Sequence, residues 1–162
     1  MTAKEYNNCW GLWADDVMQF AVRVCNDRAD CEDAVQEAFA ALWQHRGDVT
    51  VAKGKGYLIS VTYRQLMHNF RRQRVGTQYA TTVQPATQQP DTSFEAREAI
   101  EQALHTLPEV QRAILQLRDV EGYAYNEIAE ALDINENQVQ VYLFRARVAM
   151  RKQLKTMGYD EY

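Results

Sequence analysis

The sequence has no long hydrophobic run. No apolar stretch among its 162 residues approaches the roughly 20 residues that a helix needs to span a bilayer. The segment Met1 to Trp10 also lacks a basic region followed by an apolar core, which is the pattern of a secretion signal. These absences exclude a membrane partner from our expectations and favour the cytoplasm as the compartment.

Cysteine is scarce as well. Cys9, Cys25 and Cys31 contain no CxxC pair, and an odd number of cysteines gives no complete disulfide framework. No His or Cys stands at zinc-finger spacing from these residues. We therefore expect reduced, mostly buried thiols, no metal site and no cofactor.

Residue patterns that belong to enzymes are missing too. His45, His68 and His105 are widely spaced, and the chain contains neither a P-loop nor an HExxH motif. The carboxylates near residues 30–37 lack the inward-facing Glu-x-x-His pairs of di-iron bundles. The sequence thus predicts a protein that is not an enzyme.

Charge is unevenly distributed along the chain. The net charge is −4, but up to residue 80 there are 10 basic and 9 acidic residues, against 8 and 13 from residue 81 onward. A negative total does not exclude nucleic-acid binding, because local clusters of cations matter more than the sum.

Helical periodicity dominates the first part of the chain. One face is marked by Trp10, Trp13, Val17, Phe20, Ala21 and Val24. A second helix is predicted to start at Asp30 as N-cap and to bury Val35, Ala38, Phe39, Leu42 and Trp43. Gly47 to Gly56 is expected to be a loop, because it has three glycines and no apolar stripe. A third helix is predicted over Tyr57 to Arg74.

Residues 76–93 are predicted to be a flexible linker. The stretch from Val75 to Ser93 carries one charge, Asp91, and is rich in Thr, Gln and Pro, so it has little to bury. We therefore expect an all-α protein with two small helical domains, at residues 1–75 and 94–162, that fold separately.

The second domain is predicted to contain four helices. The first covers Phe94 to Leu107, and the next begins with Pro108 and runs to about Val120. A short helix over Tyr125 to Leu132, a turn at 133–135 and a last helix over 136–157 form a helix-turn-helix pattern. Asn135 and Gln138 have the spacing of a capping box. In such motifs the second helix enters a DNA major groove, although a plain helical hairpin has the same pattern.

Several motifs together resemble the extracytoplasmic-function sigma factors of bacterial RNA polymerase, in the sigma-70 family. The resemblance rests on Leu107-Pro108, Arg118-Asp119-Val120-Glu121-Gly122, the helix 125–129 and Arg145-Ala146-Arg147. In the first half, 30–44 resembles the family's polymerase-binding helix and 56–74 resembles its promoter-melting helix.

The resemblance implies a function in transcription initiation. The first domain would dock on the clamp helices of the polymerase's largest subunit and open the minus-ten promoter element. The second would lie near the flap region and read the minus-thirty-five element. The family also implies a protein partner, either an anti-sigma factor or a recruiting protein.

The second helix carries the residues expected to bind polymerase. Its acceptor side chains suit a partner rich in Arg, and they are Asp30, Glu32, Asp33, Gln36 and Glu37. Capping and solvation would account for Asp30 and Asp33, but not for Gln36 and Glu37 as well.

The third helix and the segment before it carry the residues expected at the minus-ten element. Arginines neutralise phosphates and aromatic rings stack on unpaired bases. The candidates are Lys53, Lys55, Tyr57, Tyr63, Arg64, His68, Arg71, Arg72 and Arg74. Cations at a helix C-terminus also favour the helix dipole, but three Arg within residues 71–74 exceed what a cap needs. Arg64 and His68 depart from the family pattern, which has Asn and Asp there.

The last helix departs further from the family. Gln140, Val141, Tyr142 and Phe144 stand where the pattern has Lys, Ser, Arg and His, and Asp133 replaces a turn glycine. In one interpretation the minus-thirty-five element is read by Asn137, Gln138 and Gln140, with Arg145 and Arg147 on the backbone. In the other, this domain binds DNA weakly, and a recruiting protein docks on a surface formed by Val141, Tyr142 and Phe144.

A helix-turn-helix regulator that never touches polymerase is the alternative. It would explain the second domain but would leave the acidic and arginine-rich helices of the first unused. Co-purification with core polymerase distinguishes the two.

Overall fold

The protein is seen in a computed structural model that describes residues 1–76 and 92–159, without the side chains of 74–76 and 92–94. The described residues form helices and no strand, which confirms the all-α prediction. The linker predicted over 76–93 falls almost wholly on residues 77–91, outside the described part of the chain.

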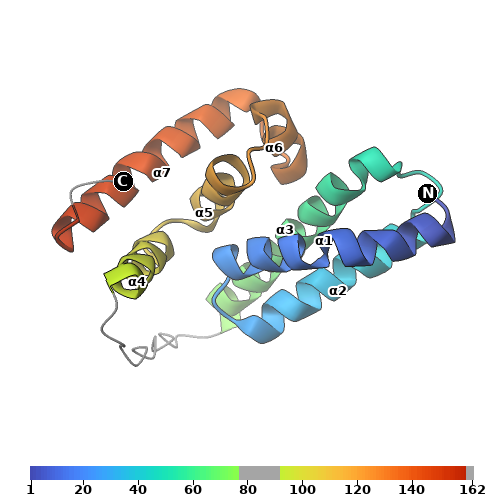
Figure 1. Ribbon diagram of the computed structural model, residues 1–162, viewed down its shortest axis with the longest axis horizontal. Coiled ribbons are helices and arrows are strands. Elements are labelled where there is room, and N and C mark those ends of the chain that lie inside the picture. The colour runs from blue at the N-terminus through green and yellow to red at the C-terminus, as the bar shows by residue number, and fades with distance from the viewer. Residues whose placement is uncertain (77–91, 160–162) are drawn as a thin grey trace.

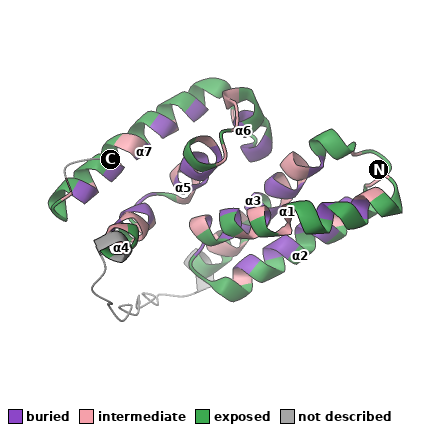
Figure 2. Ribbon diagram, in the orientation of Figure 1, coloured by how far each residue is buried: buried purple, intermediate pink, exposed green. Residues whose placement is uncertain are grey.

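The first half is a bundle of three helices, α1 (Ala3–Val24), α2 (Arg28–Gln44) and α3 (Val51–Gly76), which lie side by side in Figure 1. Each helix turns an apolar face inward (Figure 2), so the core lies along the shared axis of the bundle. Its largest fully buried side chains are Phe20, Phe39, Leu42, Leu58, Ile59 and Leu66.

The expected loop at Gly47 to Gly56 is wrong in its second part. Helix α3 already begins at Val51. Gly54 is buried, and a Cβ added there would lie 2.6 Å from the Trp13 ring. The glycine that signalled a loop is therefore a packing residue, which lets the start of α3 approach α1.

The N-cap of α2 is also corrected. Asp27, not Asp30, caps this helix: its carboxylate accepts hydrogen bonds from the backbone N–H groups of Ala29 and Asp30, at 2.9 and 3.2 Å. Both aspartates fit the sequence preference for a cap, and the tight turn after α1 selects the earlier one. Asp30 thus becomes a side chain of the helix surface.

The second half contains α4 (Thr92–His105), α5 (Glu109–Leu115), the π-helical turn η1 (Gln116–Val120), α6 (Tyr125–Leu132) and α7 (Glu136–Thr156). Pro108 is the N-cap of α5, one residue before the position predicted for it. The helix predicted to reach Val120 does so only by widening into η1. Gly122 then turns the chain with φ of +74°, a conformation that favours glycine.

Helices α6 and α7 form the predicted helix-turn-helix. Asp133 takes the left-handed conformation, with φ of +57°, where the family pattern has glycine. The capping box is present: Asn135 Oδ1 accepts from the Gln138 N–H at 2.7 Å, and Gln138 Oε1 accepts from the Asn135 N–H at 3.0 Å. Ala124 gives α6 no side-chain cap, although Glu127 accepts from its N–H.

None of the helices in the described ranges is long and apolar enough to cross a membrane. In the same residues, no group of three or more His, Cys, Asp or Glu side chains is placed to hold a metal ion. The three cysteines are free and buried, as predicted.

We expect Phe20→Ala to destabilise the first half by about 3–5 kcal/mol, because removing a fully buried ring leaves a cavity. Val22→Ala on the same helix removes an exposed side chain and should cost within about 0.5 kcal/mol. Urea unfolding followed by circular dichroism measures both. Equal losses would show that α1 does not bury the face described above.

Candidate polymerase and DNA interfaces

The exposed face of α2 is acidic. Its one cation is Arg28, whose Nε lies 3.3 Å from Glu32 Oε1, and from Ala29 to Gln44 the helix contains no Lys or Arg. Four of the side chains predicted to bind polymerase are exposed on it: Glu32, Asp33, Gln36 and Glu37. In Figure 2 this face of α2 lies on the outer side of the bundle, away from the second half. A partner that donates several hydrogen bonds can therefore reach these acceptors together.

Asp30 lies at the edge of this face, and one of its carboxylate oxygens already has a hydrogen-bond partner. Its Oδ2 accepts a hydrogen bond from Gln73 Nε2 of α3, at 3.0 Å. Partial burial, with the neighbouring Asp27 carboxylate, raises the pKa of Asp30. The sequence missed Asp27 because Asp30 offered an equally good capping signal.

One face of α3 carries cations and aromatic groups in a row. Helix α3 has no acidic residue along its whole length. Steps of three, four and seven residues place a set of side chains on one side, and these are Lys53, Tyr57, Arg64, His68 and Arg71. All of these are exposed except Tyr57, which is half-buried with its hydroxyl 3.3 Å from His45 Nδ1. We call this set the α3 strip.

Two predicted DNA-binding residues lie elsewhere. The Nζ of Lys55 lies 2.9 Å from Asp16 Oδ2 of α1 and 3.7 Å from Glu121 Oε1 of the second half. Tyr63 is only 8% exposed, and burial raises its pKa to about 12. In this arrangement neither side chain is available to DNA. Arg72 is exposed beside the strip, and the side chain of Arg74 lies outside the described residues.

The two halves pack against each other, with α1 on α5 and α3 on α6. The central contact is Arg112, a buried guanidinium of α5. Its Nε and Nη2 donate to the carbonyl oxygen of Val24, at 3.1 and 2.6 Å, and its Nη1 donates to the carbonyl of Leu107. Val24 ends α1, so one arginine ties the last turn of α1 to the loop before α5.

Ion pairs surround this contact. Arg23 of α1 pairs with Glu101 of α4. Lys55 of α3 reaches Glu121 and lies 5.9 Å from the centre of the Tyr123 ring. Burial raises the pKa of Glu121, and Lys55 opposes that shift. The interface is thus built from charged groups as well as apolar side chains.

The outer face of α7 combines cations with exposed apolar side chains. Phe144 is 68% exposed, Val141 45% and Val148 44%. Arg145 is exposed beside them, as are Asn137 and Gln140. Tyr142 is half-buried against the core, at the edge of a hollow that Asn135, Asn137, Gln138, Val141 and Arg145 also line.

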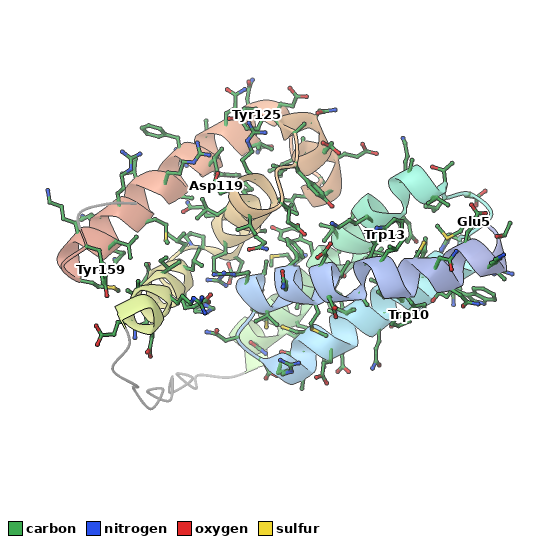
Figure 3. The ribbon with its side chains drawn as sticks, in the orientation of Figure 1. Glu5, Trp10, Trp13, Asp119, Tyr125 and Tyr159 are labelled. Atoms are coloured by element: carbon green, nitrogen blue, oxygen red, sulfur yellow. The ribbon has the colours of Figure 1, made fainter. Side chains whose placement is uncertain are left out.

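Arg147 departs from its predicted place on the DNA backbone. Its guanidinium pairs with Asp119 of η1, between α5 and α7 (Figure 3). Arg118 lies 4.6 Å from the centre of the Tyr125 ring and donates to the carbonyl of Tyr123. Three residues at the end of η1 therefore contact three different segments. Arg118 contacts residues 123–125, Asp119 pairs with Arg147 of α7, and Glu121 pairs with Lys55 of α3.

Two family models match the chain, Sigma-70 region 2 over residues 10–75 and Sigma-70, region 4 over residues 97–150. The ECF RNA polymerase sigma factor SigL of Mycobacterium tuberculosis is 30% identical over 148 residues, which cover 86% of this chain and 83% of that protein. The chain belongs to the ECF sigma factors. SigM of Bacillus subtilis is 24% identical over 145 residues, covering 86% and 89% of the two chains.

A solved structure shares the fold of this sigma factor. It is the sigma factor RpoE in complex with the anti-sigma factor NepR from Bartonella quintana, with a TM-score of 0.76 and 19% identity, covering 94% of this chain and 98% of that one. The prediction of a sigma factor with a region 2 and a region 4 fold is therefore confirmed.

His105 of this sigma factor should make the contact between its halves sensitive to pH. Burial, the nearby Arg112 and to a lesser extent Arg23 lower its pKa from 6.5, while Glu101 opposes them. Its contribution to stability is therefore present above pH 6.5 and lost as the pH falls through the lowered value, because the protonated ring adds a cation beside two arginines.

We expect thermal stability to fall more steeply between pH 6.5 and 5 in the wild type than in His105→Gln. Melting followed by circular dichroism over that range measures the difference. His68→Gln, which changes an exposed histidine on α3, is the matched control and should behave like the wild type. Parallel curves for wild type and His105→Gln would contradict the assignment.

Proposed function

We propose that this sigma factor binds core RNA polymerase through the acidic face of α2 and holds the minus-ten element on the α3 strip. The observation that supports this most is the separation of charge within one bundle. Acceptors line the exposed side of α2, whose one cation is Arg28 at its first residue, and cations without any carboxylate line α3. Arg-rich protein surfaces suit the first and nucleic-acid phosphates suit the second.

Initiation in vitro with core polymerase and a promoter library tests this function. The purified protein should direct transcripts from a defined subset of the library, while core enzyme alone should not. Failure to co-purify with core polymerase would instead favour a regulator that acts on DNA alone.

Region 4 is proposed to contact the minus-thirty-five element through α7. Asn137 and Gln140 are exposed on its outer face, and their amides can pair with base edges in a major groove. Arg145 is exposed to reach phosphate. Gln138 is partly used by the capping box, and Arg147 by Asp119. This leaves fewer DNA contacts than the sequence suggested.

The exposed apolar side chains of α7 favour a protein partner at the same place. Val141 and Phe144 precede the cations of α7, the first of which is Arg145, and no carboxylate follows Glu136 on this helix. An acidic, amphipathic segment of a recruiting protein would bury the apolar groups and pair with the cations. RpoE has a protein partner, NepR, in its solved complex. We therefore propose Val141, Tyr142 and Phe144 as the partner surface.

Full-length protein and the variant Phe144→Glu distinguish a DNA role from a partner role for this face. Selection from a randomised promoter pool at moderate salt measures DNA binding. Tight, sequence-selective binding by the wild type would remove the need for a recruiter. Weak binding, with Phe144→Glu active in vitro but inactive in cells, would support one.

The remaining assignments follow from the same function. A sigma factor initiates transcription without catalysing a reaction itself, so we propose no enzymatic activity and no cofactor. The place of action would be the cytoplasm, where RNA polymerase works. An anti-sigma factor is a second candidate for the surface on α7.

A further inference from the structure

Two cysteines lie together where α1 ends and α2 begins. Cys25 is the C-cap of α1, and Cys31 belongs to the first turn of α2. Cys31 Sγ lies 3.5 Å from the carbonyl oxygen of Cys25, and Cys25 Sγ lies 3.8 Å from that of Asp27. Both contacts stay within residues 25–31, so the two cysteines lie close together. A short polar turn brings them together at the edge of the buried core.

The third cysteine is far from this pair. Cys9 lies 16 residues before Cys25 on the same helix, about 24 Å away at 1.5 Å per residue. All three thiols are buried. However, Asn26 to Ala29, which lie between Cys25 and Cys31, are exposed, so the pair lies next to a surface turn. Cys9 therefore serves as a natural control for a buried thiol without a partner.

The pair stands directly beside the contact between the halves. Val24, the residue before Cys25, supplies the carbonyl oxygen that accepts two hydrogen bonds from Arg112. A change in the backbone at Cys25 moves that oxygen. The position of the thiols thus links them to the one buried arginine that joins region 2 to region 4 among the described residues.

We propose that Cys25 and Cys31 are a reversible thiol–disulfide site, oxidised by hydroperoxides, whose oxidation loosens the contact between the two halves. This proposal does not rest on polymerase binding. Pairs of thiols in a reducing compartment form disulfides transiently and in response to oxidants. No third ligand accompanies the pair within the described ranges, so a metal site is not the favoured use of these thiols.

The reaction has two steps. The Cys25 thiolate attacks one oxygen of the hydroperoxide, the O–O bond breaks, and Cys25 becomes a sulfenic acid while the alcohol or water leaves. The Cys31 sulfur then attacks the Cys25 sulfur, and the hydroxyl leaves as water once the Cys31 proton is transferred. Two thiols lose two electrons in total and the hydroperoxide gains them. Cys25 is the first nucleophile because it is the more exposed of the two, at 4% against 0% for Cys31, and the neighbouring Cys31 lowers its pKa.

A disulfide requires the sulfurs to approach to about 2.05 Å, closer than any non-bonded contact. We expect bond formation to draw Cys25 and the first turn of α2 toward each other. The Val24 carbonyl moves with Cys25, while Arg112 stays fixed by its hydrogen bond to Leu107. The two hydrogen bonds to Val24 are lost or lengthened, and the halves separate.

Mass spectrometry of the full-length reduced protein, treated with hydrogen peroxide, tests the disulfide. The expected product has lost two hydrogen atoms, contains a bond between Cys25 and Cys31, and returns to the starting mass with dithiothreitol. Cys9→Ser should react like the wild type, whereas Cys25→Ser and Cys31→Ser should not form the product. Oxidation of single thiols only, or bonds that include Cys9, would overturn the proposal.

A second probe needs no variant. Phenylarsine oxide bridges two neighbouring thiols and does not bridge isolated ones. It should bind the folded, reduced wild-type protein with one equivalent and protect Cys25 and Cys31, but not Cys9, from later alkylation. If phenylarsine oxide protects none of the three cysteines from alkylation, the two thiols are not close together. This result is independent of whether the serine variants fold.

Small-angle X-ray scattering tests the link to the interface. Arg112→Ala is the reference for separated halves and should have a larger radius of gyration than the reduced wild type. Oxidised wild type should approach the Arg112→Ala value, and peroxide-treated Cys25→Ser should keep the compact value. An oxidised wild type that stays compact would overturn the link while leaving the disulfide itself established.

Discussion

Reversing two charges on α2, Asp33→Lys with Glu37→Lys, is expected to weaken binding to core RNA polymerase by at least about 100-fold. Both side chains are exposed on a helix face that holds no cation. A charge-assisted hydrogen bond contributes about 1.5–3 kcal/mol, and the variant replaces two acceptors with donors that repel an Arg-rich partner. Fluorescence anisotropy of labelled protein with core enzyme measures the affinity.

The matched control makes the same charge change in region 4. Glu130 and Glu136 are exposed on α6 and α7, so Glu130→Lys with Glu136→Lys alters the total charge equally. Its affinity should remain within a few-fold of the wild type. If the two variants bind equally well, α2 does not hold the polymerase. Circular dichroism checks that both variants keep their helices.

Local signals explain why the helix-turn-helix was predicted nearly to the residue. Helix α6 covers Tyr125–Leu132 as expected, and α7 starts at Glu136 as expected. A capping box, a turn and two apolar faces all lie within a short stretch of sequence, and each is enforced by contacts between near neighbours. The acidic face of α2 was likewise predicted from the spacing of neighbouring residues along one helix.

Competing local signals explain the errors near α2 and α3. Asp27 and Asp30 are both good caps, so the sequence does not decide between them. Gly54 reads as a loop residue, but its role is to make room for Trp13 from another helix. A contact across helices outweighed the low helix propensity of glycine.

The interface between the halves has no sequence signature. Arg112 looks like an ordinary charge on an amphipathic helix, yet it donates to a backbone carbonyl 88 residues earlier in the chain. Any residue can supply a carbonyl, so no side-chain pattern marks the partner. Glu121 was noticed only as part of the family motif, and its pairing with Lys55 appears only when the two halves are placed together.

This interface limits what the first half can contact. Tyr63 is buried, with Glu109 of α5 and Tyr142 of α7 close enough to influence its hydroxyl. Lys55 is held by Asp16 and Glu121. Any use of these two side chains on DNA therefore requires the halves to move apart, whereas the α3 strip is accessible without that movement.

The α3 strip supplies the second large effect, since Arg64→Ala with Arg71→Ala should reduce open-complex formation by about 10- to 100-fold at moderate salt. Each phosphate contact on a single strand contributes about 0.7 to the slope of log affinity against log salt, so the double variant should lower that slope by about 1.4. Permanganate footprinting of the minus-ten region and binding to a forked promoter fragment measure the two quantities.

Arg97→Ala with Arg151→Ala is the charge-matched control, because both arginines are exposed but lie on α4 and α7, away from the strip and from α2. Polymerase binding should be unchanged in either double variant, which separates melting from docking. If the double variant melts the promoter poorly but the slope of log affinity against log salt is unchanged, Arg64 and Arg71 contact protein and not phosphate.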